Sequence, residues 1–219
     1  IDAELTDGSS FSAVSVTGAP DRALLAVRGD LTINSALNTA ATRDYGLYAE
    51  NAFVNFADAG KAAAITADSG TALLAKRSLI HLRGELLFKG KAGIAVTDDT
   101  ILTGIAANGT VKSTAGDALS VGAGSTALLG ELTYEASQTV LRTHGAAEVY
   151  LTTTKQTDPA VNLKMFGQTI ADLTGTDKVT IANYIMHQNA PGADAAIQSK
   201  DTDLVIPGGA LNADARKPA

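Results

Sequence analysis

The feature that most constrains the fold is a short pattern that restarts several times between residues 70 and 135. Each unit begins with a short apolar run, passes through a polar turn into a second run, and begins again near a Gly. The stretches DRALLAV, GTALLAK and STALLGE are close to copies of one another. Self-similarity at a spacing of about 20 to 50 residues is the signature of a solenoid, in which each repeat forms one layer. The sequence therefore predicts a stack of similar coils.

We anchor each coil on the first apolar residue of its first strand. Successive anchors lie 23, 26, 21, 25, 21 and 21 residues apart, which indicates a constant core with variable loops. The anchors are Leu24, Leu47, Leu73, Ile94, Leu119, Val140 and Val161. Like residues of successive parallel coils stack about 4.8 Å apart. We therefore expect the last five anchors to form one interior aliphatic ladder.

Further apolar runs follow the anchors within each unit. Second runs lie seven to nine residues after the anchors, at Ile33, Val54 with Phe56, Leu82, Ile101, Leu128, Val149 and Ile170. Third runs occur at Leu86 to Phe88, at Val111 and at Leu132 to Tyr134. Three short strands per coil describe a triangular prism. At the mean anchor spacing the chain would hold about nine to ten coils of a single-chain parallel β-helix, an all-β fold.

Composition agrees with strands better than with helices. Aromatic residues are only 5% of the chain, Trp is absent, and no Pro occurs between residues 21 and 158, which suits continuous sheet. Ala and Leu favour helix intrinsically, but no apolar stripe of helical period is sustained, except for a candidate stretch at residues 161–173. An antiparallel sandwich or barrel is the structural alternative, because its strands have similar spacing. The similarity of the restarts weighs against it.

Three segments organise the chain. Residues 1–20 are expected to form an N-terminal cap or first coil, residues 21–173 the regular coils, and residues 174–219 less regular coils, a loop and a tail. Within the last segment, residues 186–203 have the character of a loop, and residues 204–206 of one more strand. The chain begins at Ile1 without a targeting signal, so we expect a processed or excised piece. No apolar run approaches the ~20 residues of a membrane span.

The residues give little support for catalysis. Cys is absent, three His are scattered, and the sequence contains neither a nucleophile elbow nor a phosphate-binding loop, so we predict no enzyme, no cofactor and no catalytic or metal site. The acidic pairs Asp98–Asp99 and Asp201–Asp203 lack the spacing of known calcium loops. A β-helical enzyme would need converging charges, for which Asp98, Asp99 and Lys112 are the candidates. The net charge of -6 argues against nucleic-acid binding.

One run of positive charge stands out in this acidic chain. Residues 76–91 contain five cations and a single anion, and the cations are Lys76, Arg77, Arg83, Lys89 and Lys91. On one coil we expect them to collect on one side, within about a Debye length of one another, where they would bind an anionic partner such as a sulfated or sialylated glycan. The alternative is a set of solvated turns balanced by acidic neighbours.

The repeats resemble the passenger domains of monomeric autotransporters of Gram-negative bacteria. The stretches GLYAENAFVNF, SGTALLAKRSLIHLRG and DTILTGIAANGTVKSTAGDALSVGAGSTALLGELTY carry this resemblance, which spans roughly residues 21–173. It implies a right-handed parallel β-helix that is secreted or displayed at the cell surface by a C-terminal outer-membrane barrel, expected in the full-length precursor. Passengers of this kind supply no catalytic residues to carry over.

The expected function is that of a non-enzymatic adhesin or virulence factor. It would bind a host protein or surface glycan, or associate with itself, through the side of the β-helix. Two alternatives come from other classes. One is a β-helical carbohydrate-active enzyme, a polysaccharide lyase or hydrolase, and the other is a phage or fibre structural protein.

Overall fold

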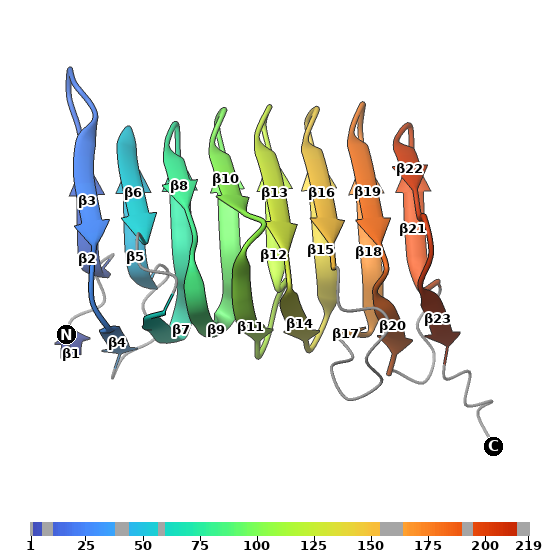
Figure 1. The fold of residues 1–219 in the computed structure, drawn as a ribbon, viewed down its shortest axis with the longest axis horizontal. Helices are drawn as coiled ribbons and strands as arrows, with labels where there is room; N and C mark the ends of the chain where they lie inside the picture. The colour runs from blue at the N-terminus through green and yellow to red at the C-terminus, as the bar shows by residue number, and fades with distance from the viewer. Residues whose placement is uncertain are drawn as a thin grey trace.

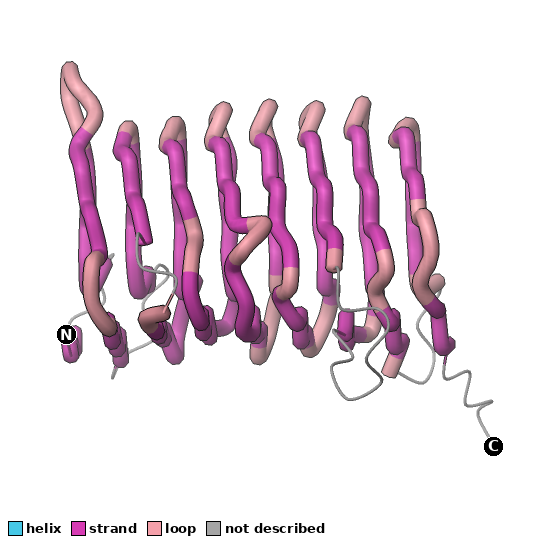
Figure 2. The backbone as a smooth tube through the Cα atoms, in the orientation of Figure 1, coloured by secondary structure: helices cyan, strands magenta, loops and turns pink. Residues whose placement is uncertain are grey.

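The chain folds as a parallel β-solenoid of about seven turns. The computed structural model describes residues 2–5, 11–37, 44–56, 60–153, 164–189 and 195–213, and every regular element in these ranges is a strand. Strands of successive coils lie side by side along the long axis (Figure 1). The loops lie where one strand of a coil leads into the next (Figure 2). The predicted all-β parallel fold with three strand segments per coil is confirmed. Of residues 161–173, the candidate helix, residues 164–167 and 169–173 lie in strands, and residues 161–163 lie outside the described residues.

Each coil contributes one strand segment to each of three faces. The first face contains β2 (Phe11–Thr17), β5 (Asp44–Glu50), the C-terminal parts of β7 (Ala62–Lys76) and β9 (Gly84–Thr97), β12 (Leu119–Gly122), β15 (Thr139–His144), β18 (Thr169–Thr174) and β21 (Ile197–Lys200). The second face contains β3 (Ala23–Val27), β6 (Ala52–Phe56), β8 (Leu79–His81), β10 (Ile101–Gly104), β13 (Thr126–Gly130), β16 (Glu148–Thr152), β19 (Lys178–Ala182) and β22 (Asp203–Val205). The third face contains β1 (Asp2–Leu5), β4 (Leu31–Leu37), the N-terminal parts of β7 and β9, β11 (Ala107–Ser113), β14 (Leu132–Ala136), β17 (Lys164–Gly167), β20 (Ile185–Gln188) and β23 (Ala210–Ala213). Because β7 and β9 continue across a corner, the first and third faces form one 15-stranded sheet, and the second face is a separate 8-stranded sheet.

The predicted interior ladder exists on the first face, with corrections at its ends. Leu73 is in register with Leu47 on one side and with Ile94 on the other, and Ile94 is in register with Leu119. The next member is Leu141 and not Val140. Val140 is also buried, beside the corner between the third and first faces, so hydrophobicity alone could not separate these two neighbours. Val161 lies outside the described residues.

The prediction that Leu24 anchors the interior of its coil is wrong. It lies on the second face, points outward and is 67% exposed, whereas its neighbour Leu25 is in register with Val54 in the interior. A shift of one residue turns a strand side chain to the opposite face. The first-face position of that coil belongs to Val14, which pairs with Leu47.

The other two faces add two more interior ladders. The predicted third runs are confirmed, because their inward residues Leu86, Phe88, Val111, Leu132 and Tyr134 are all buried. Of the predicted second runs, the residues buried on or next to the second face are Val54, Phe56, Leu82 and Val149. Ile101 and Leu128 point outward from that face, Ile33 belongs to the third face, and Ile170 belongs to the first. Each fully buried aliphatic side chain contributes roughly 1.5–3 kcal/mol, so the three ladders supply much of the driving force.

Nine to ten coils is too many for this chain. The estimate assumed that every coil is close to the mean anchor spacing. In the structure, Val14 and Leu47 occupy equivalent positions 33 residues apart, and Leu141 and Ala171 occupy equivalent positions 30 residues apart. Longer connections between strands lengthen a coil without adding another, so the same number of residues forms fewer coils. The coils nevertheless continue beyond residue 186, where β21 replaces part of the expected loop and β22 is the expected extra strand.

Buried hydroxyl groups form a further, polar ladder at the corner between the first and second faces. This hydroxyl ladder consists of Ser78, Thr100 and Ser125. The backbone N–H of Ser78 donates to Oγ1 of Thr100 at 3.3 Å, and the N–H of Thr100 donates to Oγ of Ser125 at 3.1 Å. Oγ1 of Thr100 also donates to the carbonyl of Thr97 at 2.7 Å. The hydroxyls therefore satisfy backbone groups that the turn takes out of the strand ladder.

Ionic contacts join coils on the outside of the first face. Arg142 donates from Nε to Oδ2 of Asp117 at 2.8 Å and from Nη1 to Asp172, so one side chain spans three consecutive strands or turns. The hydrogen bond to Asp117 raises the pKa of Arg142 above its ordinary value. In the interior, burial raises the pKa of Tyr134 and of Tyr184, so both hydroxyls stay neutral well into the alkaline range.

Candidate binding surface

The predicted basic stretch does not gather on one side of the rod. Residues 76–91 pass from the end of the first face, across the second face, to the end of the third, so their side chains are distributed around the coil. Lys76 ends β7 on the first face, Arg77 and Arg83 lie in turns, Lys89 lies on the third face, and Lys91 follows it at the next corner. A triangular coil separates residues that a linear reading places together.

Arg77 already has acidic partners from neighbouring coils. Its guanidinium forms an ion pair with Glu50 of the preceding coil, and its Nη1 lies 4.0 Å from Oδ2 of Asp98 in the following coil. The hydroxyl of Tyr48 also donates to Glu50. Burial, followed by that hydrogen bond and the charge of Glu50, raises the pKa of Tyr48 to about 12. For Arg77, the balanced turn considered from the sequence describes the geometry better than an open cationic site.

The charges proposed for the enzymatic alternative are also apart. Asp98 and Asp99 lie in the turn between β9 and β10, and both have left-handed backbone angles, with φ of 57° and 60°. Asp is among the residues that tolerate this conformation, which explains the pair structurally. Lys112 lies on the third face, where it binds Glu135. Within the described ranges, no three His, Asp or Glu side chains are grouped as metal ligands.

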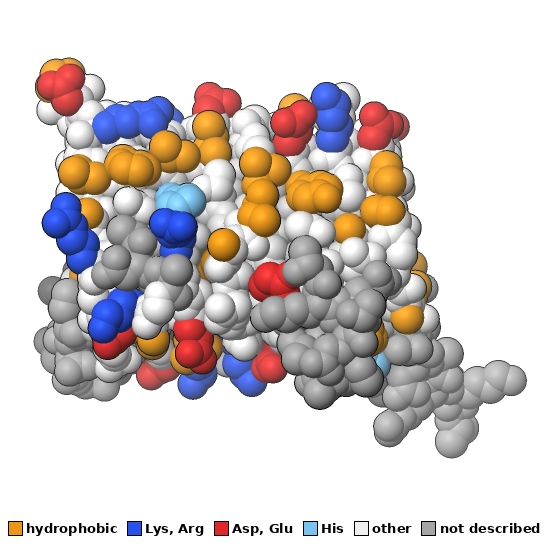
Figure 3. All heavy atoms as spheres, in the orientation of Figure 1, with side chains coloured by type: hydrophobic (Ala, Val, Ile, Leu, Met, Phe, Trp, Pro, Cys, Tyr) orange, Lys and Arg blue, Asp and Glu red, His pale blue; other side chains and the backbone are white. Residues whose placement is uncertain are grey.

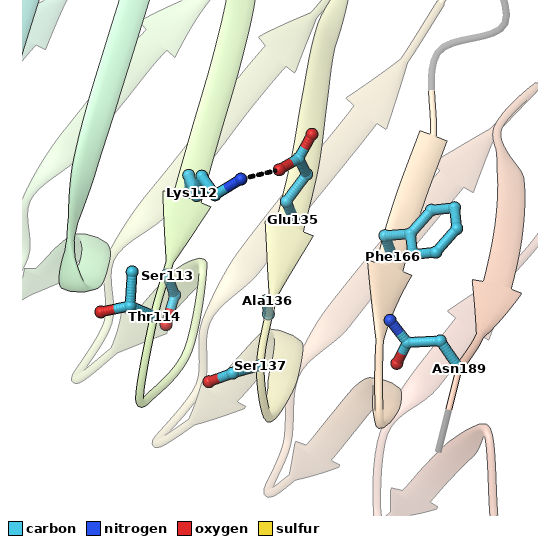
Figure 4. Close-up of a pocket in the computed structure, with 8 residues that line it drawn as sticks. All are labelled: Lys112, Ser113, Thr114, Glu135, Ala136, Ser137, Phe166 and Asn189. Atoms are coloured by element: carbon cyan, nitrogen blue, oxygen red, sulfur yellow. Dashed lines mark hydrogen bonds and ion pairs between the residues drawn. The ribbon is translucent and has the colours of Figure 1, made fainter.

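The described surface contains a hollow of about 550 Å³ on the third face. We call it the third-face hollow, and Figure 4 shows the side chains that line it. They are Lys112, Ser113, Thr114, Glu135, Ala136, Ser137, Phe166 and Asn189. Ligand pockets commonly have volumes of about 300–1,000 Å³, so the hollow is large enough for a small ligand or one part of a larger one.

Three of these side chains occupy one outward row. Lys112 of β11 is in register with Glu135 of β14, and Glu135 is in register with Phe166 of β17. Nζ of Lys112 lies 2.6 Å from Oε2 of Glu135, which joins the first two members (Figure 4). The row continues to His187 of β20, whose ring stacks on that of Phe166 with centroids 4.9 Å apart and an interplanar angle of 27°. The stacking holds the phenyl ring against a side chain of the next coil.

Small polar side chains surround the row where the third face ends. Ser113 is buried, and its Oγ donates to the carbonyl of Lys91 at 2.6 Å and accepts from the N–H of Gly116 at 2.9 Å. Thr114 donates to the carbonyl of Gly90 at 3.1 Å. Ser137 and Asn189 are exposed at the edge of the hollow. The hollow thus combines an aromatic ring, a carboxylate, an ammonium group, three hydroxyls and an amide.

This set of groups suits binding. A nucleophile needs a base within hydrogen-bond reach. The two hydroxyls of the lining that make hydrogen bonds, those of Ser113 and Thr114, donate them to backbone carbonyls. An aromatic ring with a few convergent polar groups is the usual composition of a recognition site.

Sequence reasoning did not find the hollow. The linear charge pattern groups Lys112 with Asp98 and Asp99 and leaves out Glu135, Phe166 and Asn189. A signal was present, because Lys112 follows Val111 and Glu135 follows Tyr134, each directly after an inward residue of a third run. Outward residues at equivalent positions become neighbours once the coils are stacked.

A different surface lies on the second face. An outward apolar row is formed in register by Leu24, Phe53, Leu79 and Ile101, and beyond it Leu128 and Tyr150 are paired in the next outward position. Hydrophobic side chains form a band across this face (Figure 3). Ile101 is 45% and Tyr150 40% exposed. The second face is therefore more apolar on its outside than the third-face hollow is.

Fold and surface together define the class: a parallel β-solenoid with a lateral hollow. Comparison of the chain with protein-family models, with curated proteins and with solved structures gave no match. Among the described residues, the structure has no helix of the length and hydrophobicity that a membrane crossing requires.

Proposed function

We propose that this chain is a non-enzymatic β-helical rod of the autotransporter passenger type, secreted or displayed on a Gram-negative cell surface. It acts as an adhesin or virulence factor that binds a host protein or a glycan through the side of the rod. The observation that carries the proposal is the third-face hollow, whose row Lys112, Glu135 and Phe166 comes from three consecutive coils. The repeats that resemble passenger domains support the location.

The solenoid suits such a role for a physical reason. Each outward side chain is mounted on a strand that is hydrogen-bonded on both sides, so a row of them is held at the strand spacing of about 4.8 Å. A ligand that contacts several coils then meets groups that are already positioned, which lowers the entropic cost of binding. A long lateral surface built this way favours an extended partner.

Binding through the hollow can be tested with paired variants. Purified chain carrying Glu135→Lys, which places a third cation in register with Lys89 and Lys112, is compared with wild type for adhesion to host cells. Glu148→Lys on the second face is the matched control, because it makes the same change of charge at another outward strand position and also removes an ion pair, the one with Lys178 of the next coil. We expect loss of adhesion only for the first variant. Equal adhesion of both variants and wild type, all with unchanged circular dichroism, would refute the proposal.

The location requires a separate experiment. Antibodies against the folded rod should label intact cells that produce the full-length precursor. Labelling that appears only after lysis would contradict surface display. Self-association, the other expected mode, is measured by sedimentation of the purified chain, where a concentration-dependent rise in mass would identify a second copy as the partner.

A further inference from the structure

We propose that the third-face hollow binds an uncharged sugar ring of a glycan chain, with Phe166 as the stacking surface and Glu135, Lys112 and Asn189 as the hydrogen-bonding groups. This inference rests on the proposed function and names the ligand class of its site. It differs from the anionic glycan expected from the basic stretch, because other residues and another kind of recognition carry it.

The aromatic ring supplies the first half of the recognition. A pyranose has C–H groups on its faces and hydroxyls around its rim, so it combines an apolar surface with a polar edge. Phe166 lines the hollow and is held by its stacking on His187 at 4.9 Å. A ring that is already fixed loses little conformational freedom when a ligand stacks on it. Aromatic side chains also bury more apolar area than other residue types.

The polar side chains supply the second half. A sugar hydroxyl both donates and accepts hydrogen bonds, as do Ser and Thr hydroxyls. The carboxylate of Glu135 accepts and the ammonium of Lys112 donates, and their atoms lie 2.6 Å apart, so neighbouring hydroxyls of one sugar can reach both groups. The amide of Asn189 offers a donor and an acceptor at the edge of the hollow.

The charge balance indicates that the sugar is neutral. Among the described residues that line the hollow, the single cation and the single anion neutralise each other, so these side chains present no net charge to attract an acidic ligand. A sulfate or carboxylate would have to displace Glu135 from Lys112 before it could bind the ammonium group. Lys89, the next cation on the row, is a register neighbour of Lys112 but does not line the hollow.

The strand spacing adds a geometric reason for a chain of sugars. Coils are about 4.8 Å apart, close to the length that one pyranose unit adds to an extended glycan. The outward row continues beyond the hollow to His187 on one side and to Lys89 on the other. A glycan that lies along the rod axis can therefore place successive sugars over successive coils, and longer oligosaccharides should bind more tightly than monosaccharides.

The experiment uses the whole purified chain on an array of neutral, sulfated and sialylated oligosaccharides, followed by titration calorimetry with the best neutral probe. We expect binding to neutral oligosaccharides that persists in high salt. Glu135→Gln and Phe166→Ala should each weaken affinity at least tenfold, and Tyr150→Ala, which removes an exposed aromatic ring of the second face, should not. Circular dichroism checks the fold, and Glu135→Gln keeps the shape of the side chain if Phe166→Ala does not fold.

Two results would overturn the inference. One is binding that is confined to sulfated or sialylated glycans and disappears in high salt. The other is the absence of glycan binding. If the chain binds no glycan but still adheres to host cells in a way that depends on Glu135, the sugar is wrong and the proposed function stands. If neither binding occurs, both fail.

Discussion

Replacing Thr100 by Val tests the hydroxyl ladder at the corner between the first and second faces. Thr100 is fully buried, its Oγ1 accepts from the N–H of Ser78 at 3.3 Å, and it donates to the carbonyl of Thr97 at 2.7 Å. Val has almost the same shape as Thr but cannot make either bond, so the change removes the hydrogen bonds and leaves no cavity. The N–H of Ser78 would remain buried without a partner.

The expected cost follows from these two bonds. A buried donor left unsatisfied costs about 1–3 kcal/mol, and the lost bond to Thr97 costs about 1 kcal/mol. The added methyl group offsets about 0.8 kcal/mol through apolar burial. We therefore expect the free energy of unfolding to fall by about 2 kcal/mol.

The measurement is urea unfolding followed by far-ultraviolet circular dichroism. Thr110→Val is the matched control, because Thr110 points outward from β11 and lies away from this corner. Its effect should stay within about 0.5 kcal/mol, as for most surface substitutions. For Thr100→Val we expect a lower midpoint with an unchanged slope. If the two variants unfold at the same urea concentration, the corner hydroxyls do not stabilise the stack.

Three further predictions concern other layers of the structure. Leu119→Ala removes a member of the first-face ladder and should cost about 2–5 kcal/mol in urea unfolding; a cost below about 1 kcal/mol would contradict its place in the core. Arg142→Met breaks the contacts to Asp117 and Asp172, and should cost at most about 1 kcal/mol in low salt and less in high salt; a larger loss in high salt would contradict an ionic role. Folding raises the pKa of Tyr48 to about 12, so its contribution to stability is complete below the unfolded value of about 10 and is lost as pH rises through about 12. Between about pH 10 and pH 12, the stability of Tyr48→Phe against thermal unfolding should therefore fall less than that of wild type. If the two plots of stability against pH run parallel, the raised pKa does not belong to Tyr48.

Much of the fold was predictable because each strand carries its own pattern. The alternation in Leu86, Leu87 and Phe88 identifies which side chains face inward, and the same reading is correct for Val111 and Tyr134. Alternation does not identify the inward side chain where two neighbouring residues are both apolar. Leu24 and Leu25 are equally hydrophobic, and only pairing with Val54 shows which one points into the core.

The candidate surface was less predictable for a related reason. Residues 76–91 were grouped by their distance along the chain, but a triangular coil turns them toward different sides. The residues of the third-face hollow were not grouped, although they come from equivalent positions. Lys112 and Glu135 are 23 residues apart in sequence, and their charged atoms are 2.6 Å apart in space.

By itself, the sequence determined the class of fold. Inward apolar residues recur in every coil, and parallel stacking buries them together without needing information from distant parts of the chain. Only the tertiary structure decided which outward residues are neighbours. Connections of unequal length separate the equivalent positions of successive coils. The register of Lys112, Glu135 and Phe166 is therefore set by the hydrogen bonds between coils, and no fixed spacing along the sequence predicts it. The surface of this protein therefore depends on the stacking that its core produces.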